Sequence, residues 1–144
     1  MNGRTALGTI AITCMFALPV FAGGTGDLQR YFSDAATKAK AAVSPAEKRR
    51  ILNESFRVVS NALDIAASMP FTSKQDIAGI QRFKSAVQDK QDELAGTNGF
   101  TRVPDTQLNA FSGYVVQDME QADQTITISV VTLLIILLVI LIIL

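Results

Sequence analysis

The stretch SPAEKRRILNESFRVVSNALDIAASMP, residues 44–70, decides the fold class. It begins with Ser44-Pro45-Ala46-Glu47, where serine suits an N-cap, proline the first helical position and glutamate the third position of a capping box. Met69-Pro70 ends the pattern. Between these signals the apolar residues recur at three- and four-residue steps, the spacing of one helical face. They are Ile51, Leu52, Phe56, Val59, Leu63 and Ala66. The stretch therefore predicts an amphipathic helix that runs to about Ser68.

The segments on both sides of this helix repeat the helical pattern. A first helix is predicted over residues 27–43, and Thr72 or Ser73 is expected to cap a third helix that runs to Gly96. The residues Gly96-Thr97-Asn98-Gly99 predict a turn, in a loop of residues 96–104 that we expect to be a hinge. A fourth apolar stripe extends from Leu108 to Ala122. The sequence therefore predicts an all-α fold, an antiparallel bundle of three to four helices within residues 23–125.

The residues after the bundle form the most apolar part of the chain. Residues 126–144 read ITISVVTLLIILLVILIIL, in which 16 of 19 residues are Ile, Leu or Val. A helix of this length would reach roughly 28 Å, close to the ~30 Å hydrocarbon thickness of a bilayer. We therefore predict one C-terminal transmembrane helix from Ile126 to Leu144, into which the fourth helix can run without a break. Ser129 and Thr132 are its candidate contacts with a partner helix.

The N-terminal residues have the order of a secretory signal. Arg4 precedes an apolar core over residues 6–16, and Val20-Phe21-Ala22 offers compact residues for cleavage after Ala22. Residues 1–22 are accordingly predicted to be a signal peptide, with an uncleaved N-terminal anchor as the alternative. Signal and span together predict a membrane-anchored protein whose bulk is extracytoplasmic, on the periplasmic or cell-surface side. Its C-terminus is expected at the cytoplasmic leaflet, with no cytoplasmic domain.

The composition excludes several classes of function. The chain has 13 Lys and Arg against 13 Asp and Glu, and this neutral balance argues against a nucleic-acid partner. Histidine is absent and Cys14 is the only cysteine, so imidazole catalysis and an intramolecular disulfide are excluded. The nearest pairs of a hydroxyl with a lysine are adjacent in sequence, and adjacent residues do not face each other on a helix. We therefore predict that the chain is not an enzyme and binds no cofactor.

Two charged clusters have both a functional and a structural interpretation. The carboxylates at positions 89, 92 and 93 share one helical turn, but they fit an ordinary solvated helix end better than a metal site, so no metal is predicted. Lys48, Arg49, Arg50 and Arg57 form a basic cluster, the candidate interaction site for anionic headgroups or a phosphate-bearing partner. Their structural interpretation is a solvated helix face, with Arg50 and Glu54 as an i,i+4 pair.

Charge is also unevenly distributed along the chain. Residues 27–60 are basic in excess, whereas residues 103–125 carry acidic charge only. This asymmetry can dock the second helix on the fourth, or one copy of the chain on another.

By elimination, the sequence predicts a non-enzymatic, single-pass accessory or scaffold subunit of a membrane-associated complex. Its partners would be the lipid bilayer and either another protein or a second copy, bound through the helical domain. One alternative is a surface ligand-binding or adhesion module whose tail is an anchor or is replaced by a lipid, with Ser112-Gly113 as the candidate attachment residues. The other alternative is a small envelope enzyme with a carboxylate site.

Overall fold

The computed structural model describes residues 26–143 of the 144-residue chain, and all regular structure in this range is helical. The predicted signal peptide, residues 1–22, and the last residue of the predicted span, Leu144, lie outside the described residues. The elements are α2 (Gly26–Ala41), α3 (Pro45–Ser68), α4 (Lys74–Ala95), the short 3-10 helix η1 (Asp105–Gln107), α5 (Leu108–Thr125) and α6 (Val130–Ile143).

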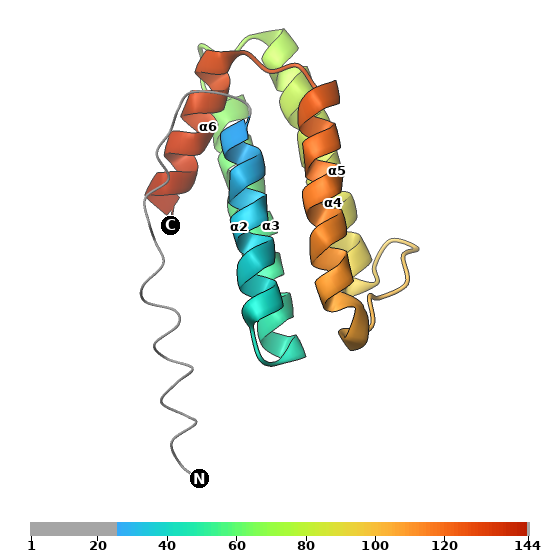
Figure 1. Ribbon diagram of the computed structural model, residues 1–144. Coiled ribbons are helices and arrows are strands. Elements are labelled where there is room, and N and C mark those ends of the chain that lie inside the picture. The colour runs from blue at the N-terminus through green and yellow to red at the C-terminus, as the bar shows by residue number, and fades with distance from the viewer. Residues whose placement is uncertain (1–25, 144) are drawn as a thin grey trace.

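Helices α2 to α5 form an antiparallel four-helix bundle (Figure 1). Helix α3 packs against α2 and α4, and α5 packs against the same two helices, so the four helices close a ring around one core. The predicted all-α bundle is therefore confirmed. Helix α6 is a fifth helix that lies outside this ring and packs mainly on α3.

The local signals for helix ends act as the sequence predicts. The Ser44 hydroxyl accepts a hydrogen bond from the Glu47 N–H at 3.1 Å, and the Ser73 hydroxyl accepts one from the Asp76 N–H at the same distance. Gly96 ends α4 in the left-handed conformation, with φ 76°, which glycine adopts without steric cost. Only the first helix differs slightly, because it ends at Ala41 and not at residue 43.

The core of the bundle is built around three phenylalanines from three helices. The ring of Phe32 on α2 lies 6.4 Å from that of Phe56 on α3 and 6.5 Å from that of Phe83 on α4, measured between centroids. All three side chains are buried, and such tilted pairs add to the free energy gained from burial alone. The predicted stripe on α3 points into this core, with only Ile51 partly exposed.

The C-terminal transmembrane helix is not found as predicted. Helix α5 ends at Thr125, residues 126–129 are not helical, and α6 has 14 residues. Within residues 26–143, no helix combines the length and the apolar character that a membrane crossing requires. The expected continuous run from the fourth helix into the span is wrong, because the chain turns at residues 126–129 and α6 folds back along the bundle (Figure 1).

Candidate functional site

The turn between α5 and α6 is held by a carboxylate of α4. One oxygen of Asp76 accepts a hydrogen bond from the Ser129 N–H at 2.9 Å. The other oxygen accepts bonds from the hydroxyls of Ser129 and Thr132, each at 2.6 Å. Asp76 is buried, with 8% of its surface exposed. We call Asp76, Ser129 and Thr132 the Asp76 clip, and it joins two of the predicted span residues to the bundle.

The Asp76 clip also stabilises the N-terminus of α6. The first N–H groups of a helix lack partners within it, and its N-terminus carries partial positive charge, which a carboxylate stabilises. Here the Ser129 carbonyl accepts from the Leu133 N–H at 3.0 Å, and Asp76 places its charge beside this first turn. The hydrogen bonds from Ser129, and then those from Thr132, lower the pKa of Asp76 below its ordinary value. The carboxylate is therefore charged at neutral pH.

A glycine on α4 makes room for the same turn. A Cβ atom on Gly79 would lie 2.6 Å from the carbonyl oxygen of Thr127 and 2.9 Å from Cγ1 of Ile128. Both distances are shorter than van der Waals contact, and the first involves backbone that cannot move without moving the turn. The absence of a side chain at Gly79 therefore lets residues 126–129 cross α4 closely.

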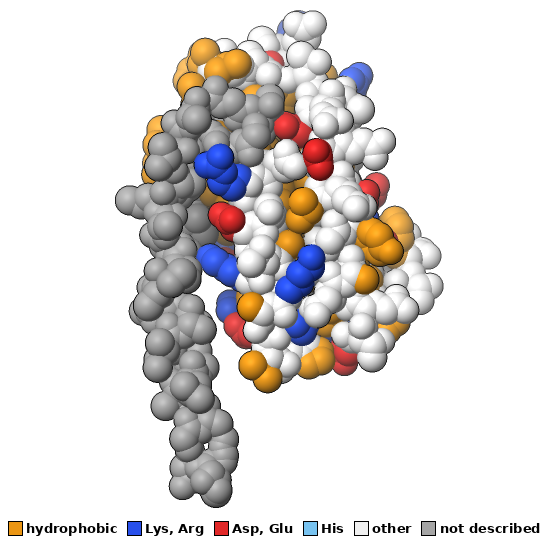
Figure 2. Space-filling view, in the orientation of Figure 1, with side chains coloured by type: hydrophobic (Ala, Val, Ile, Leu, Met, Phe, Trp, Pro, Cys, Tyr) orange, Lys and Arg blue, Asp and Glu red, His pale blue; other side chains and the backbone are white. Residues whose placement is uncertain are grey.

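Helix α6 is aliphatic on its buried and on its exposed side. The buried side joins the core of the bundle. Its buried apolar residues are Leu133, Ile136, Leu137, Val139 and Ile140. The exposed side, which we call the outer face, consists of Val130, Val131, Leu134, Leu138 and Ile142, each between 41% and 73% exposed. Part of this apolar surface is visible at the upper left of Figure 2. The helix contains no ionisable residue.

In the basic cluster, Lys48 holds the end of another helix. Its ammonium group donates to the carbonyl oxygens of Ala39 and Lys40, at 3.1 and 3.0 Å, and to the Asn109 side chain at 2.9 Å. The two carbonyls belong to the last turn of α2, where a cation suits the partial negative charge of the helix end. Lys48 therefore joins α2 and α5 to α3.

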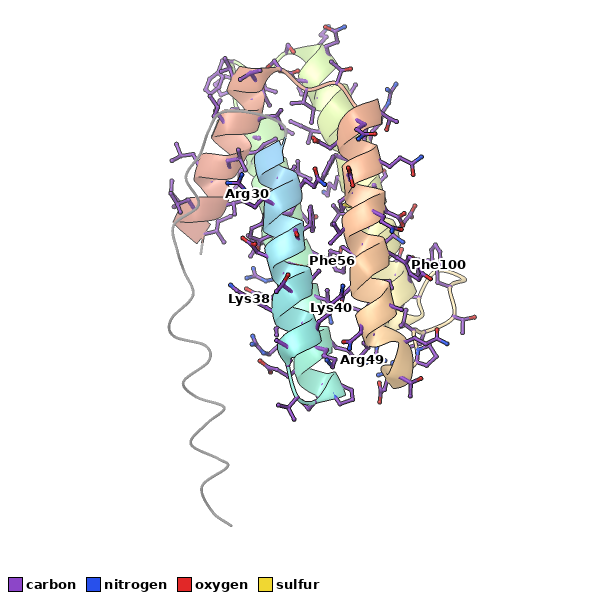
Figure 3. All side chains as sticks on the ribbon, viewed as in Figure 1. Arg30, Lys38, Lys40, Arg49, Phe56 and Phe100 are labelled. Carbon is purple, nitrogen blue, oxygen red and sulfur yellow. The ribbon has the colours of Figure 1, made fainter. Side chains whose placement is uncertain are left out.

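Arg49 fastens the predicted hinge loop. Its guanidinium donates to the carbonyl oxygens of Leu94, just before the loop, and of Val103, near the end of the loop, and to the carboxylate of Asp105 at 2.8 Å. The Arg49 side chain is 13% exposed and lies at the lower end of the bundle in Figure 3. Both ends of the 96–104 loop are therefore held by one side chain of α3.

The remaining two cluster residues form ion pairs at the surface. Arg50 pairs with Glu47 and Arg57 pairs with Glu54, each three residues apart on α3. The expected i,i+4 pair between Arg50 and Glu54 is replaced by these two i,i+3 pairs. The Arg50 and Arg57 side chains are 60% and 52% exposed, so of the four they are the ones that a partner can reach. A role of the basic cluster in partner binding stays a prediction.

Two of the three carboxylates at the end of α4, Asp92 and Glu93, have protein partners. Asp92 accepts hydrogen bonds from the side chains of Gln88, Thr97 and Asn98, which shapes the turn after Gly96. Glu93 pairs with Lys90, which also bridges to Asp118 on α5. Within the described part of the chain, no three His, Cys, Asp or Glu residues are grouped so that they could hold a metal ion.

Sequence reasoning missed the two residues that position the C-terminal helix, Asp76 and Gly79.

Comparison of the chain with protein-family models, with curated proteins and with solved structures found no match. The function is therefore inferred from the site itself.

Proposed function

We propose that this chain is a non-enzymatic accessory or scaffold subunit of a membrane-associated complex, attached to the bilayer through residues 126–144. The outer face of α6 is the observation that carries this proposal. A helix that only closes a bundle needs one apolar stripe and is normally polar on its other side. Aliphatic side chains on both sides suit a helix that also contacts the acyl chains of a membrane.

In this proposal the attachment takes the form of a single span from Ile126 to Leu144, with the helical domain on the extracytoplasmic side. The N-terminal signal pattern supports that orientation. The domain would then bind its partner, another protein or a second copy, through exposed charge. Arg50 and Arg57 on α3 and the acidic residues that precede the span are the candidates.

The membrane part is tested by fractionating cells that express the full chain. We expect the wild type in the membrane fraction, released by detergent only. The double variant Leu134→Lys, Leu138→Lys places two charges on the outer face, where both residues are exposed and the fold does not need them, and it should move to the soluble fraction. Val43→Lys is the matched control, because Val43 is 98% exposed in the turn between α2 and α3 and should leave the distribution unchanged.

A soluble wild type, or a double-lysine variant that stays in the membrane fraction, would contradict attachment through α6. The subunit role is tested separately by mild cross-linking in the membrane, followed by purification and intact-mass analysis of every chain recovered. A stoichiometric protein partner or a defined homo-oligomer is expected. A monomer that captures nothing argues against it, and a mass that ends before Ile126 with an added lipid would favour the lipid-anchored module.

A further inference from the structure

We propose that the Asp76 clip is a latch that determines which of two helices the C-terminal segment forms. When the clip is closed, the segment is a short helix docked on α3. When it is open, the segment becomes one longer helix that enters the bilayer. This inference rests on the proposed membrane function and adds how attachment is controlled.

The two forms of the C-terminal segment differ in length. The 14 residues of α6 reach about 21 Å as a helix, well short of the ~30 Å hydrocarbon layer. The full apolar run of 19 residues, 126–144, would reach roughly 28 Å. Most of the difference lies in residues 126–129, the turn that the Asp76 clip holds and that crosses Gly79. The clip therefore acts on the residues that separate a helix too short to span from one of matching length.

Contacts with α4, and not turn-forming residues, keep residues 126–129 out of a helical conformation. Residues 126–129 read Ile-Thr-Ile-Ser, without Gly or Pro, so the usual turn signals are missing. Ile126 is extended, with φ −102° and ψ 127°, a conformation that any residue can leave for a helix. In a bilayer each backbone N–H and C=O must be paired within the chain, which favours the helical form of these four residues.

The side chains of α6 suit both the docked position on the bundle and the interior of a bilayer, whereas the part of α3 that α6 covers suits only the docked state. Its buried side is aliphatic and packs on the bundle, and its outer face is aliphatic and exposed. Release of α6 in water would expose both its own buried side and the part of α3 that it covers, at a cost in free energy. A bilayer removes the cost for α6 itself. The docked state is therefore favoured in water, and a membrane shifts the equilibrium toward the released state, as expected of a two-state element.

The test measures how deep position 138 lies in a membrane. The full chain carries Cys14→Ser and Leu138→Cys, and a fluorophore is attached at position 138, which is exposed in the docked state. Phosphatidylcholine vesicles with a nitroxide quencher at the ends of the acyl chains report insertion. Asp76→Ala should raise the ratio of inserted to docked chain by about tenfold, the order expected when a charged hydrogen-bond acceptor is removed.

Asp92→Ala is the matched control. Asp92 is also buried and also accepts three hydrogen bonds, but it holds the turn after Gly96 and makes none of the contacts of the clip. A second variant, Ser129→Ala with Thr132→Val, removes the two hydroxyl donors and leaves Asp76 in place at the start of α4. Far-ultraviolet circular dichroism shows whether Asp76→Ala folds. If it does not fold, the double variant tests the latch in its place.

The outcomes separate the latch from the proposed function. Increased insertion of Asp76→Ala and of the Ser129/Thr132 variant, with Asp92→Ala unchanged, supports the latch. Equal insertion of all chains, wild type included, overturns the latch and leaves membrane attachment intact. Equal gains for Asp76→Ala and Asp92→Ala would assign the effect to general destabilisation and also overturn the latch. No insertion by any chain overturns both.

Discussion

Arg49 reaches from α3 to the carbonyl oxygens of Leu94 and Val103 and to the carboxylate of Asp105. Replacing it by alanine leaves two partly buried carbonyls without their charged donor. We expect Arg49→Ala to lower the free energy of unfolding by about 2–3 kcal/mol, measured by urea denaturation. Arg50→Ala is the control, because it breaks an exposed pair with Glu47 and should have no measurable effect. Equal losses for the two variants would contradict a structural role specific to Arg49.

Tyr31 is expected to titrate far above the ordinary range. Burial raises its pKa from 10 to about 12, with a smaller contribution from the negative charge of Glu54. Because the folded pKa lies above the unfolded one, the stability that comes from the neutral phenol is complete below pH 10 and is lost as the pH rises toward 12.

An absorbance titration of phenolate formation checks this prediction. It should contain a component near pH 12 that Tyr31→Phe removes. A titration in which Tyr31→Phe changes nothing above pH 10 would contradict the raised pKa of Tyr31.

At the scale of elements, two helical glycines should respond in opposite directions to the same change. Gly113→Ala on α5 adds a Cβ whose nearest neighbour is the Lys40 ammonium at 3.8 Å, so the higher helix propensity of alanine should stabilise the protein by about 0.5–1 kcal/mol. Gly79→Ala gains the same propensity, but its Cβ would press on the Thr127 carbonyl. We expect a net loss of about 1–3 kcal/mol for this variant.

Chemical denaturation of the two glycine variants checks the prediction. Each is compared with the wild type under the same conditions, and circular dichroism confirms that the helical content is kept. A stabilising Gly79→Ala would mean that the turn at residues 126–129 does not cross α4 closely in solution.

The helices α2 to α5 could be predicted because their signals are local. The Ser44 and Ser73 caps act on residues three positions away, and Gly96 acts at its own backbone. The apolar stripes depend only on helical periodicity, which a single sequence displays. The same reasoning covers the internal loop, where Asn98 and Gly99 also have positive φ, as a turn of this composition requires.

The placement of α6 could not be predicted in this way. Asp76 and Ser129 are 53 positions apart, and an aspartate in the first turn of a helix looks ordinary in the sequence. Hydrophobicity alone predicts one continuous span over residues 126–144. It does not reveal the turn at residues 126–129, because that turn contains no Gly or Pro. One signal in the sequence was missed: Val58 and Ala62 are apolar but lie outside the predicted stripe of α3, and the structure shows both of them buried. A second buried stripe on one helix indicates a further packing partner.

At the scale of the whole molecule, α6 is the helix that can undock without unfolding the other four helices. Helices α2 to α5 each contact two neighbours in the ring, whereas α6 packs mainly on α3. Hydrogen exchange in detergent-free solution should therefore show α6 opening on its own, with its amides at least about tenfold less protected than those in the middle of α3.

Asp76→Ala should lower the protection of α6 further, because it removes the acceptor for the Ser129 N–H and both hydroxyls, while α2 keeps its wild-type exchange rates. Asp92→Ala serves as the comparison, since its hydrogen bonds lie at the other end of α4. If α6 and α3 exchange at one common rate in every variant, the five helices unfold as a single unit. In that case the energy needed to undock α6 equals the stability of the whole fold, and a membrane could take up this helix only by unfolding the bundle.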